Sequence, residues 1–329
     1  MRTRLRRGPH PAYASAVHGD VGIQTERIRC GDVALECTVA GNPDQPLAVL
    51  LHGFPESRHS WRHQIGMLAQ RYQVVAPDLR GYGNSDRPHE IRAYRVDRLA
   101  ADIRHLVAAC GRSTATVVGH DWGGAIAWTL AIDDARLAHG EHGVVGGTAG
   151  QPLLERLVVM NCPHPARFAR TVRLSAAQQS RSAYFGFFLL PVVPEWLLAL
   201  GDFTVLEHLI QWSLGDRDIE SVFGPCFRDR FAAALGDPRS LNAALNYYRA
   251  AILHADELRA RYASDAPRIT CPTMVVWGED DPALGIELID DLAPLFAHGA
   301  PRIERLPRCG HWVQQEAPER VNALLADFL

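Results

Sequence analysis

Short apolar segments alternate with longer segments of helical periodicity along most of the chain. The apolar segments are rich in Val, Ile and Leu and predict strands at residues 33–39, 47–51, 73–76, 114–118, 157–160, 273–277 and 302–306. Helical spacing of apolar residues is clearest at residues 94–110 and after Pro318. Because strands and helices alternate, and runs such as 47–51 are apolar throughout, the pattern predicts an α/β fold with a mostly parallel sheet and helices on both faces.

The alternation stops between residues 163 and 265, where the chain is aromatic, rich in Arg and helical in pattern. The strand pattern resumes at Ile269. The simplest division is a core of residues 25–162 and 266–329, interrupted by a helical cap at 163–265 that covers the carboxyl edge of the sheet as a lid. Residues 1–24 begin with a basic segment, and we expect them to form a disordered tail.

Composition excludes several kinds of chemistry. The chain has 34 Arg residues and no Lys. Without an ε-amine it cannot form a P-loop, a protein-kinase site or a Schiff base with a substrate or pyridoxal cofactor. The net charge of −3 gives no indication of a nucleic-acid partner.

Cysteine usage and apolar content bear on the location of the protein. The seven cysteines are odd in number and include no C-x-x-C pair, which favours a reducing compartment. The basic tail lacks the apolar segment of a secretory signal. The most apolar stretch, 184–200, is interrupted by Pro191, Pro194 and Glu195, so it falls short of the ~20 residues that a membrane span needs. We expect a cytoplasmic protein without a membrane span, in which this stretch lines a pocket.

A nucleophile elbow is predicted where the strand at 114–118 meets the next helical pattern. The sequence there is Gly-His-Asp-Trp-Gly-Gly, residues 119–124, which has the G-x-nucleophile-x-G form with Asp121 at its centre. Glycines flank the nucleophile because larger residues would collide with the adjoining strand and helix. A simple N-cap role for Asp121 is the alternative interpretation.

An aspartate at this position selects a particular reaction. A carboxylate is ionised at neutral pH and needs no base to activate it. Its attack on an ester carbonyl would form a high-energy anhydride, whereas its attack on saturated carbon gives an ordinary alkyl ester. Epoxides and alkyl halides are therefore the substrates that it favours, and the ester must then be hydrolysed by an activated water beside an oxyanion hole.

The remaining catalytic groups are expected at the ends of other strands. His311 follows the strand at 302–306 and is the predicted base, oriented by a carboxylate after the strand at 273–277. Asp281 is preferred there to Asp280. The first apolar strand ends in His-Gly-Phe-Pro, residues 52–55, so the backbone N–H groups of Phe54 and Trp122 are assigned to the oxyanion hole. Pro55 could follow a cis peptide bond.

Four segments together resemble the epoxide hydrolases of the α/β-hydrolase fold, and the likeness covers about residues 28–329. The segments are His-Gly-Phe-Pro-Glu-Ser (52–57), Asp-Leu-Arg-Gly-Tyr-Gly-Asn-Ser (78–85), the elbow (119–124) and Gly-His-Trp (310–312). The resemblance implies Asp121 as nucleophile, Asp281 as acid and His311 as base, with a small-molecule epoxide and water as substrates. It also implies two cap tyrosines that bind and protonate the epoxide oxygen.

The two cap tyrosines are assigned by their surrounding motifs. Leu-Asn-Tyr-Tyr-Arg, residues 245–249, matches the second tyrosine motif of that family and gives Tyr248, while residues 182–191 resemble the first and give Tyr184. An opening epoxide develops alkoxide character, which two phenols can bond and protonate. Phe54, Trp122 and Tyr247 are expected to contact the substrate, and Tyr247 to pack in the cap or line its pocket.

Three other interpretations use the same scaffold. Haloalkane dehalogenases share the Asp-Trp-Gly-Gly elbow but commonly have a polar residue where Phe54 stands, and fluoroacetate dehalogenases have Arg at the positions of Trp122 and Ala125. A non-catalytic ligand receptor would be favoured by a broken set of Asp, Asp and His. The set is intact here, so the enzyme reading is preferred.

A few further features are expected to play no part in catalysis. Residues 133–151 are longer than the turn usual in that family, and we expect a surface loop that could form a homo-oligomer contact. His59 and His63 have metal-pair spacing without a supporting Glu, so no metal is expected. No glycine run has a dinucleotide fingerprint, so no cofactor is implied. His52 and His120 are expected to brace loops.

Overall fold

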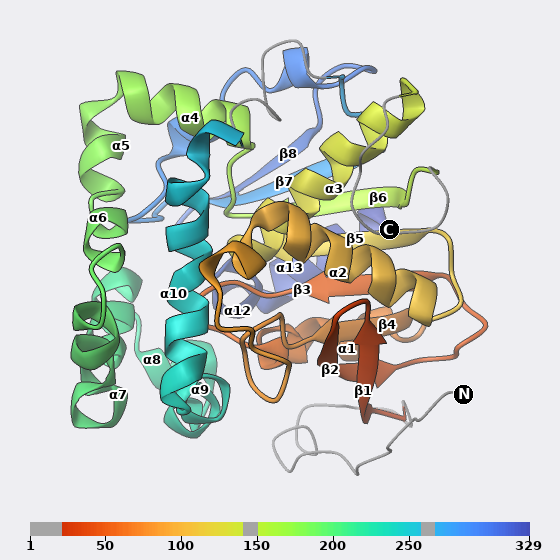
Figure 1. Ribbon diagram of the computed structural model, residues 1–329. Coiled ribbons are helices and arrows are strands. Elements are labelled where there is room, and N and C mark those ends of the chain that lie inside the picture. Colours follow the sequence, from red (N-terminus) through yellow and green to blue (C-terminus); the bar gives the residue numbers. More distant parts are fainter. Residues whose placement is uncertain (1–21, 141–150, 258–266) are drawn as a thin grey trace.

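The centre of the protein is an eight-stranded sheet, seen here in a computed structural model that describes residues 22–140, 151–257 and 267–329 (Figure 1). Its strand order is β1-β2-β4-β3-β5-β6-β7-β8. The first three strands in this order pair antiparallel, and all the following pairs are parallel. The strands are β1 (Gln24–Cys30), β2 (Val33–Ala40), β3 (Leu47–Leu51), β4 (Gln73–Pro77), β5 (Ala115–His120), β6 (Leu154–Met160), β7 (Thr273–Gly278) and β8 (Arg302–Leu306).

The predicted strands all occur, and the predicted mostly parallel α/β sheet is confirmed. The sequence pattern missed one strand, β1. This strand lies at an edge of the sheet and carries charged residues, among them Glu26, Arg27 and Arg29, so its apolar content is too low to predict a strand.

Helices cover both faces of the sheet because successive strand residues point to opposite sides. Val117 packs in a core with α2 and α3, whereas Val118 packs in a second core with α1 and α13. These helices and the short ones near them are η2 (Arg58–Trp61), α1 (Arg62–Leu68), η3 (Ile91–Tyr94), α2 (Val96–Ala109), α3 (Trp122–Ala138), η4 (Ile286–Ile289), η5 (Ala293–Leu295), α12 (Val313–Glu316) and α13 (Pro318–Phe328).

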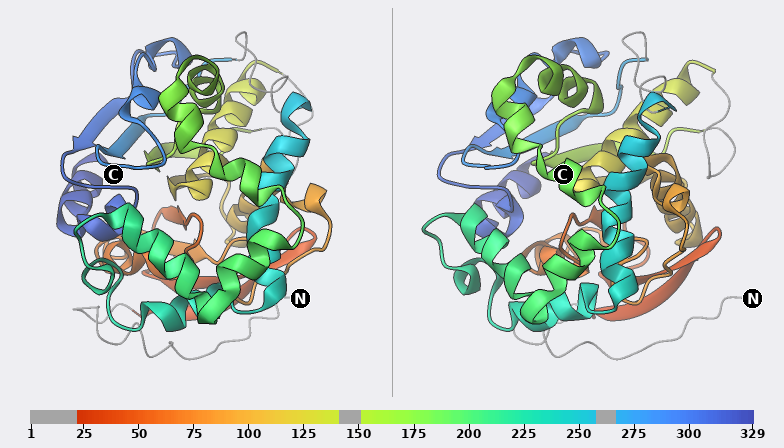
Figure 2. Two further views of the ribbon diagram at one scale, coloured as in Figure 1. Left: turned by 90° about the vertical axis from the view of Figure 1, so that its left-hand side faces the viewer. Right: turned by 60° about the vertical axis from the view of Figure 1, so that its left-hand side comes forward.

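The named elements between β6 and β7 in the described chain are helices. They lie in front of the sheet in the left view of Figure 2, in green and cyan. They are α4 (Pro165–Leu174), α5 (Ala176–Arg181), α6 (Tyr184–Phe188), α7 (Val193–Leu214), α8 (Ile219–Phe223), α9 (Phe227–Leu235) and α10 (Pro238–Leu253). The predicted helical insert is therefore present. Its predicted range, 163–265, ends among residues that the structure does not describe.

Two predicted boundaries need correction. A surface loop was expected from residue 133, but α3 continues to Ala138, and Asp134 is buried. Its carboxylate accepts hydrogen bonds from Arg104 and from the backbone N–H groups of Leu153 and Leu154, so this part of the segment joins α3 to the start of β6. Residues 141–150 lie outside the described residues. So do residues 1–21 of the predicted tail, and its last residue, Gln24, already belongs to β1.

The apolar stretch of the cap does not form one long helix. No single helix among the described residues is long and apolar enough to cross a membrane, although residues 176–188 and 193–214 pass the length and composition test as a pair bent by 92°. Helix α7 is itself interrupted by non-helical backbone at residues 200–203. All seven cysteines lie in the described part of the chain, and none forms a disulfide.

Candidate active site

The turn between β5 and α3 holds Asp121 in a strained backbone conformation, with φ at 50° and ψ at −120°. Glycines make this turn sterically feasible. A Cβ at residue Gly119 would lie 2.3 Å from the carbonyl oxygen of Gly123, and a Cβ at Gly123 would lie 2.1 Å from that of Leu51. Since backbone atoms on both sides have no room to move, larger residues are excluded. The turn therefore presents Asp121 beyond the carboxyl end of β5, as the predicted elbow requires.

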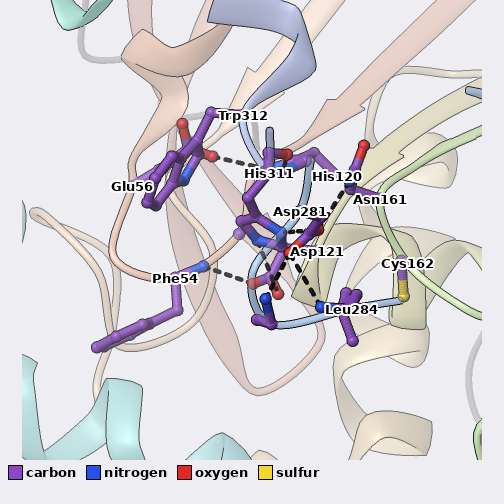
Figure 3. A network of polar contacts seen from close by, with 12 residues as sticks. Phe54, Glu56, His120, Asp121, Asn161, Cys162, Asp281, Leu284, His311 and Trp312 are labelled. Atoms are coloured by element: carbon purple, nitrogen blue, oxygen red, sulfur yellow. Dashed lines mark hydrogen bonds and ion pairs between the residues drawn. The ribbon is translucent and has the colours of Figure 1, made fainter. Parts of the chain in front are cut away.

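The Asp121 carboxylate has a different neighbour at each oxygen (Figure 3). The backbone N–H of Phe54 donates to Oδ1 at 2.8 Å, and Oδ2 lies 3.6 Å from Nε2 of His311. Burial acts to raise the pKa of Asp121, but His311 outweighs burial, and the pKa lies below its ordinary value. Asp121 is thus an ionised carboxylate with one oxygen bound to a backbone N–H. The Phe54–Pro55 peptide bond is cis.

The structure brings Asp281, rather than Asp280, to His311. Nδ1 of His311 lies 2.7 Å from Oδ2 of Asp281, while Asp280 is exposed. Because an ionised carboxylate only accepts hydrogen bonds, Nδ1 carries the proton of this bond. Nε2 of His311 therefore faces Asp121 and the space where a water could be activated.

Backbone and amide groups hold Asp281 in place. Its Oδ1 accepts from the N–H groups of Ala283 at 2.8 Å and Leu284 at 3.0 Å, and its Oδ2 accepts from Nδ2 of Asn161 at 2.7 Å. Asn161 follows β6 and also accepts from the N–H of Gly278 at 2.9 Å. Sequence reasoning missed Asn161. A signal existed, because a polar residue follows the apolar run of β6 at the same edge of the sheet as the elbow.

His311 lies between two carboxylates. Burial acts to lower its pKa, but Asp281 and Asp121 outweigh burial and raise the pKa well above its usual value. For Asp281, burial acts to raise the pKa, and His311 and Asn161 lower it below its usual value. The resting site therefore holds an imidazolium between two carboxylates.

His52 and His120 are placed as loop braces, as the sequence predicted. Nε2 of His52 accepts from the N–H of Leu79 at 3.0 Å, and its Nδ1 bonds the carbonyl oxygen of Gly53 at 2.9 Å. Nε2 of His120 donates to the carbonyl oxygen of His311 at 2.8 Å. These contacts fix the loop after β3 and the loop that carries His311.

A buried glutamate that the sequence reasoning missed completes the second brace. Oε2 of Glu56 lies 2.9 Å from Nδ1 of His120, and the amides of Gln314 and Gln315 donate to the same carboxylate. A carbonyl can only accept, so Nε2 of His120 must be the donor to His311. Nδ1 of His120 is then the ring atom that faces Glu56. The pair forms a second carboxylate–histidine unit directly behind the first.

The cap contributes an aromatic cluster around the nucleophile. The ring of Tyr248 lies 5.6 Å from that of Phe54, 5.0 Å from that of Trp122 and 6.0 Å from that of Tyr184. Burial, followed by the charge of Asp121, raises the pKa of Tyr184 well above its usual range. Burial, followed by the neighbouring Tyr184 and Asp121, does the same for Tyr248. Both phenols therefore keep their protons at neutral pH and can act as donors.

Tyr247 occupies a different place from Tyr248. It is fully buried, its hydroxyl donates to the carbonyl oxygen of Arg80 at 2.7 Å, and its ring packs 5.5 Å from that of Trp122. The structure thus shows Tyr247 as a packing residue beneath Trp122, and its contact with substrate stays a prediction. Within the three described ranges, no group of three or more His, Cys, Asp or Glu residues is arranged to hold a metal ion.

Comparisons with known proteins show the family to which the chain belongs. Residues 46–318 match the family described as the alpha/beta hydrolase fold. Epoxide hydrolase 3 of Xenopus tropicalis is 32% identical over 99% of this chain and 83% of that protein. Epoxide hydrolase A of Mycobacterium tuberculosis is 31% identical over 94% of this chain and 98% of that protein.

The chain is also similar to solved structures of epoxide hydrolases. One from work on novel epoxide hydrolases in metagenomes from hot environments has a TM-score of 0.75 at 34% identity, covering 92% of this chain and 97% of that one. The epoxide hydrolase of Bacillus megaterium in complex with an inhibitor has a TM-score of 0.75 at 28% identity, covering 92% and 99%. The chain belongs to the epoxide hydrolase family of the alpha/beta hydrolase fold.

Proposed function

We propose that the protein converts an epoxide to a vicinal diol by adding water, through an alkyl ester formed on Asp121. The observation that carries this proposal is the arrangement around the nucleophile. An ionised aspartate stands at the elbow with its Oδ1 on the N–H of Phe54, and its Oδ2 faces Nε2 of His311. Such a carboxylate is suited to attack saturated carbon and to be regenerated by hydrolysis.

In the first step, Oδ2 of Asp121 attacks a ring carbon of the epoxide and the carbon–oxygen bond of the ring breaks. The epoxide oxygen takes the electron pair of that bond and a proton from Tyr184 or Tyr248. Two phenols that keep their protons are suited to this role, since they can bind the oxygen as its charge develops. The products of the step are a hydroxyalkyl ester and a tyrosinate.

In the second step, the imidazolium of His311 first gives its proton to the tyrosinate, and its free Nε2 then takes a proton from water as the water oxygen attacks the carbonyl carbon of the ester. The N–H groups of Phe54 and Trp122 stabilise the oxyanion that forms. The tetrahedral intermediate then expels the diol alkoxide, which takes the proton of the intermediate's hydroxyl group, and the Asp121 carboxylate is restored. His311 keeps the proton taken from water, so the imidazolium, the carboxylate and both phenols of the resting site are regenerated.

The charge on Asp121 also sets the order of the two steps. In the free enzyme, the carboxylates of Asp121 and Asp281 raise the pKa of His311. Esterification removes the charge of Asp121 and therefore lowers the pKa of His311. The imidazole becomes a base at the stage when water must be activated.

The test is turnover in ¹⁸O-water. Hydrolysis at the carbonyl carbon places one oxygen of water in the carboxylate of Asp121, so the peptide that contains Asp121 should gain label over repeated turnovers. An Asp121→Ala variant should form no diol, and a His311→Gln variant should form the ester and hydrolyse it slowly. Label that appears only in the diol, with none in Asp121 after many turnovers, would exclude the covalent route.

A parallel assay separates this activity from dehalogenation, which would use the same nucleophile. Diol release from an aryl epoxide and halide release from a short alkyl halide are measured with the same preparation. We expect diol. Halide release without diol would contradict the proposal and support the dehalogenase reading.

A further inference from the structure

Arg249 follows Tyr248 in α10 and connects this helix to α6. It is 5% exposed, and its guanidinium donates to the carbonyl oxygen of Phe188 at 3.0 Å and to that of Leu190 at 2.8 Å. Phe188 is the last residue of α6, where helical carbonyls lack partners in the helix. The end of α6 is therefore attached to α10 beside Tyr248.

Glu195 completes this attachment from the other side. Nη1 of Arg249 donates to its Oε1 at 2.7 Å and Nη2 donates to its Oε2 at 3.1 Å, while Nδ2 of Asn242 donates to Oε1 at 2.7 Å. Burial acts to raise the pKa of Glu195, but Arg249 outweighs burial and the pKa lies below its usual value. Glu195 stands in the first turn of α7. One charged pair thus holds the α6–α7 connection against α10.

Helix α5, which precedes α6, is held separately by a contact to the core. The buried Gln178 of α5 donates from Nε2 to the carbonyl oxygen of Ala283 at 2.9 Å, and its Oε1 accepts from the N–H of Gly285 at 3.0 Å. Both partners belong to the loop after Asp281. Helix α5 is therefore anchored to the acid loop, and the far end of α6, which carries Tyr184, is anchored to α10.

The attachment at Arg249 bears on the spacing of the two phenols. The ring of Phe188 lies 4.9 Å from that of Tyr248 and 5.4 Å from that of Tyr184. Arg249 holds the backbone of this same phenylalanine. A displacement of the end of α6 would move Phe188 and change the distance between the phenols.

We propose that Arg249, paired with Glu195, is a positioning residue that keeps Tyr184 and Tyr248 at the spacing needed to protonate the opening epoxide. The inference rests on the proposed function, because it concerns the alkylation step of that reaction. Arg249 acts through the end of α6 and touches no reacting atom. Its planar fork bonds two carbonyls and a bidentate carboxylate together, which the single ammonium of a lysine cannot do.

The test is an Arg249→Lys variant studied by single-turnover kinetics with excess enzyme. The rate of ester formation should fall about 10- to 100-fold, as expected when reacting groups are misplaced by about 1 Å. The rate of ester hydrolysis should stay within about twofold of the original, because that step uses core residues held by other contacts. Because ester formation is slower while hydrolysis is unchanged, less ester should accumulate than in the parent enzyme.

Arg230 offers a matched control in the same cap. It donates to the carbonyl oxygens of Pro225 at 2.8 Å and Gly224 at 3.2 Å, and so holds the α8–α9 connection rather than α6. An Arg230→Lys variant should weaken the cap at the α8–α9 connection and leave the rate of ester formation unchanged. If both variants form the ester more slowly, the effect comes from a general loss of cap stability, and the proposal is overturned.

A double-mutant cycle with Tyr184→Phe supplies the second readout. If Arg249 acts through Tyr184, Arg249→Lys should have little further effect on ester formation in the Tyr184→Phe background. Independent, multiplicative effects would refute the proposal, as would equal slowing of both steps. If Arg249→Lys does not fold, Glu195→Gln, which keeps the side-chain shape, is tested in the same cycle. A parent enzyme that forms no ester at all would instead refute the proposed function.

Discussion

Replacing Asp281 with asparagine should separate the two half-reactions. The carboxylate bonds Nδ1 of His311 at 2.7 Å and is fully buried on its side chain. An Asp281→Asn variant keeps the shape and removes the charge that stabilises the imidazolium during water activation. Ring opening, which uses Asp121 and the cap tyrosines, is not affected directly. Asp280→Asn is the control, because Asp280 precedes it and is exposed.

The size of the effect follows from the geometry. Two unit charges with centres about 4 Å apart interact by about 4 kcal/mol at an effective dielectric constant of about 20. Since about 1.4 kcal/mol corresponds to a tenfold change in rate, loss of this interaction should slow ester hydrolysis by about 10³-fold. This value lies within the 10²–10⁴ range, roughly, that general-base catalysis contributes. Ester formation should change by less than about tenfold.

The assay is rapid-quench mass spectrometry of the intact protein during a single turnover, with melting temperatures measured in parallel. Asp281→Asn should accumulate the ester to near stoichiometry and then lose it slowly, and Asp280→Asn should behave as the parent does. If both variants hydrolyse the ester at the parental rate, Asp281 does not orient the base. If Asp281→Asn slows only ester formation, our assignment of the two steps is wrong.

Two further predictions concern pH and the elbow. Esterification removes one of the charges that raise the pKa of His311, so in the ester His311 becomes protonated as the pH falls, and ester hydrolysis should slow. Ester formation should persist to lower pH, because the pKa of Asp121 lies below its usual value. Stopped-flow fluorescence in acid should therefore show more ester, and a constant or smaller amount would contradict this order of protonation. At the elbow, Gly119→Ala should destabilise the fold by at least about 1–3 kcal/mol through its clash with backbone. In contrast, Gly186→Ala in α6, where a Cβ meets nothing within 4 Å, should be neutral or stabilise it by up to about 1 kcal/mol; equal unfolding curves for the two variants would argue against the steric account.

Much of the fold was predictable because its signals are local. Buried parallel strands are apolar throughout, so the runs at β3 and β5 stand out from the helices between them. Residues after such strands meet at one edge of the sheet, which is why Asp121, Asp281 and His311 could be brought together before their contacts were known. The charged edge strand β1 lacks this signal and was missed.

Polar contacts between distant segments were not predictable in the same way. Glu56 and His120 are far apart in the chain and have no periodic relation, yet both sit behind His311. Glu195 and Arg249 are also far apart in the chain, and they form their ion pair only in the folded protein. Asn161 could have been suspected from its place after β6, but its bond to Asp281 depends on how two loops pack. Which residues form such pairs depends on the tertiary structure, and a single sequence shows only which side chains are present.

The pairing of β6 with β7 has a consequence for how this protein can vary. These strands are neighbours in the sheet although the whole cap lies between them in the chain. The cap can therefore be lengthened, shortened or exchanged without altering any strand register, provided that its two ends still meet the sheet at the same places. In the proposed mechanism, the groups that hydrolyse the ester belong to the core, whereas the two phenols that protonate the epoxide oxygen belong to the cap. Chimeras that combine this core with the cap of a relative offer a direct way to change ring opening while the residues of ester hydrolysis stay the same.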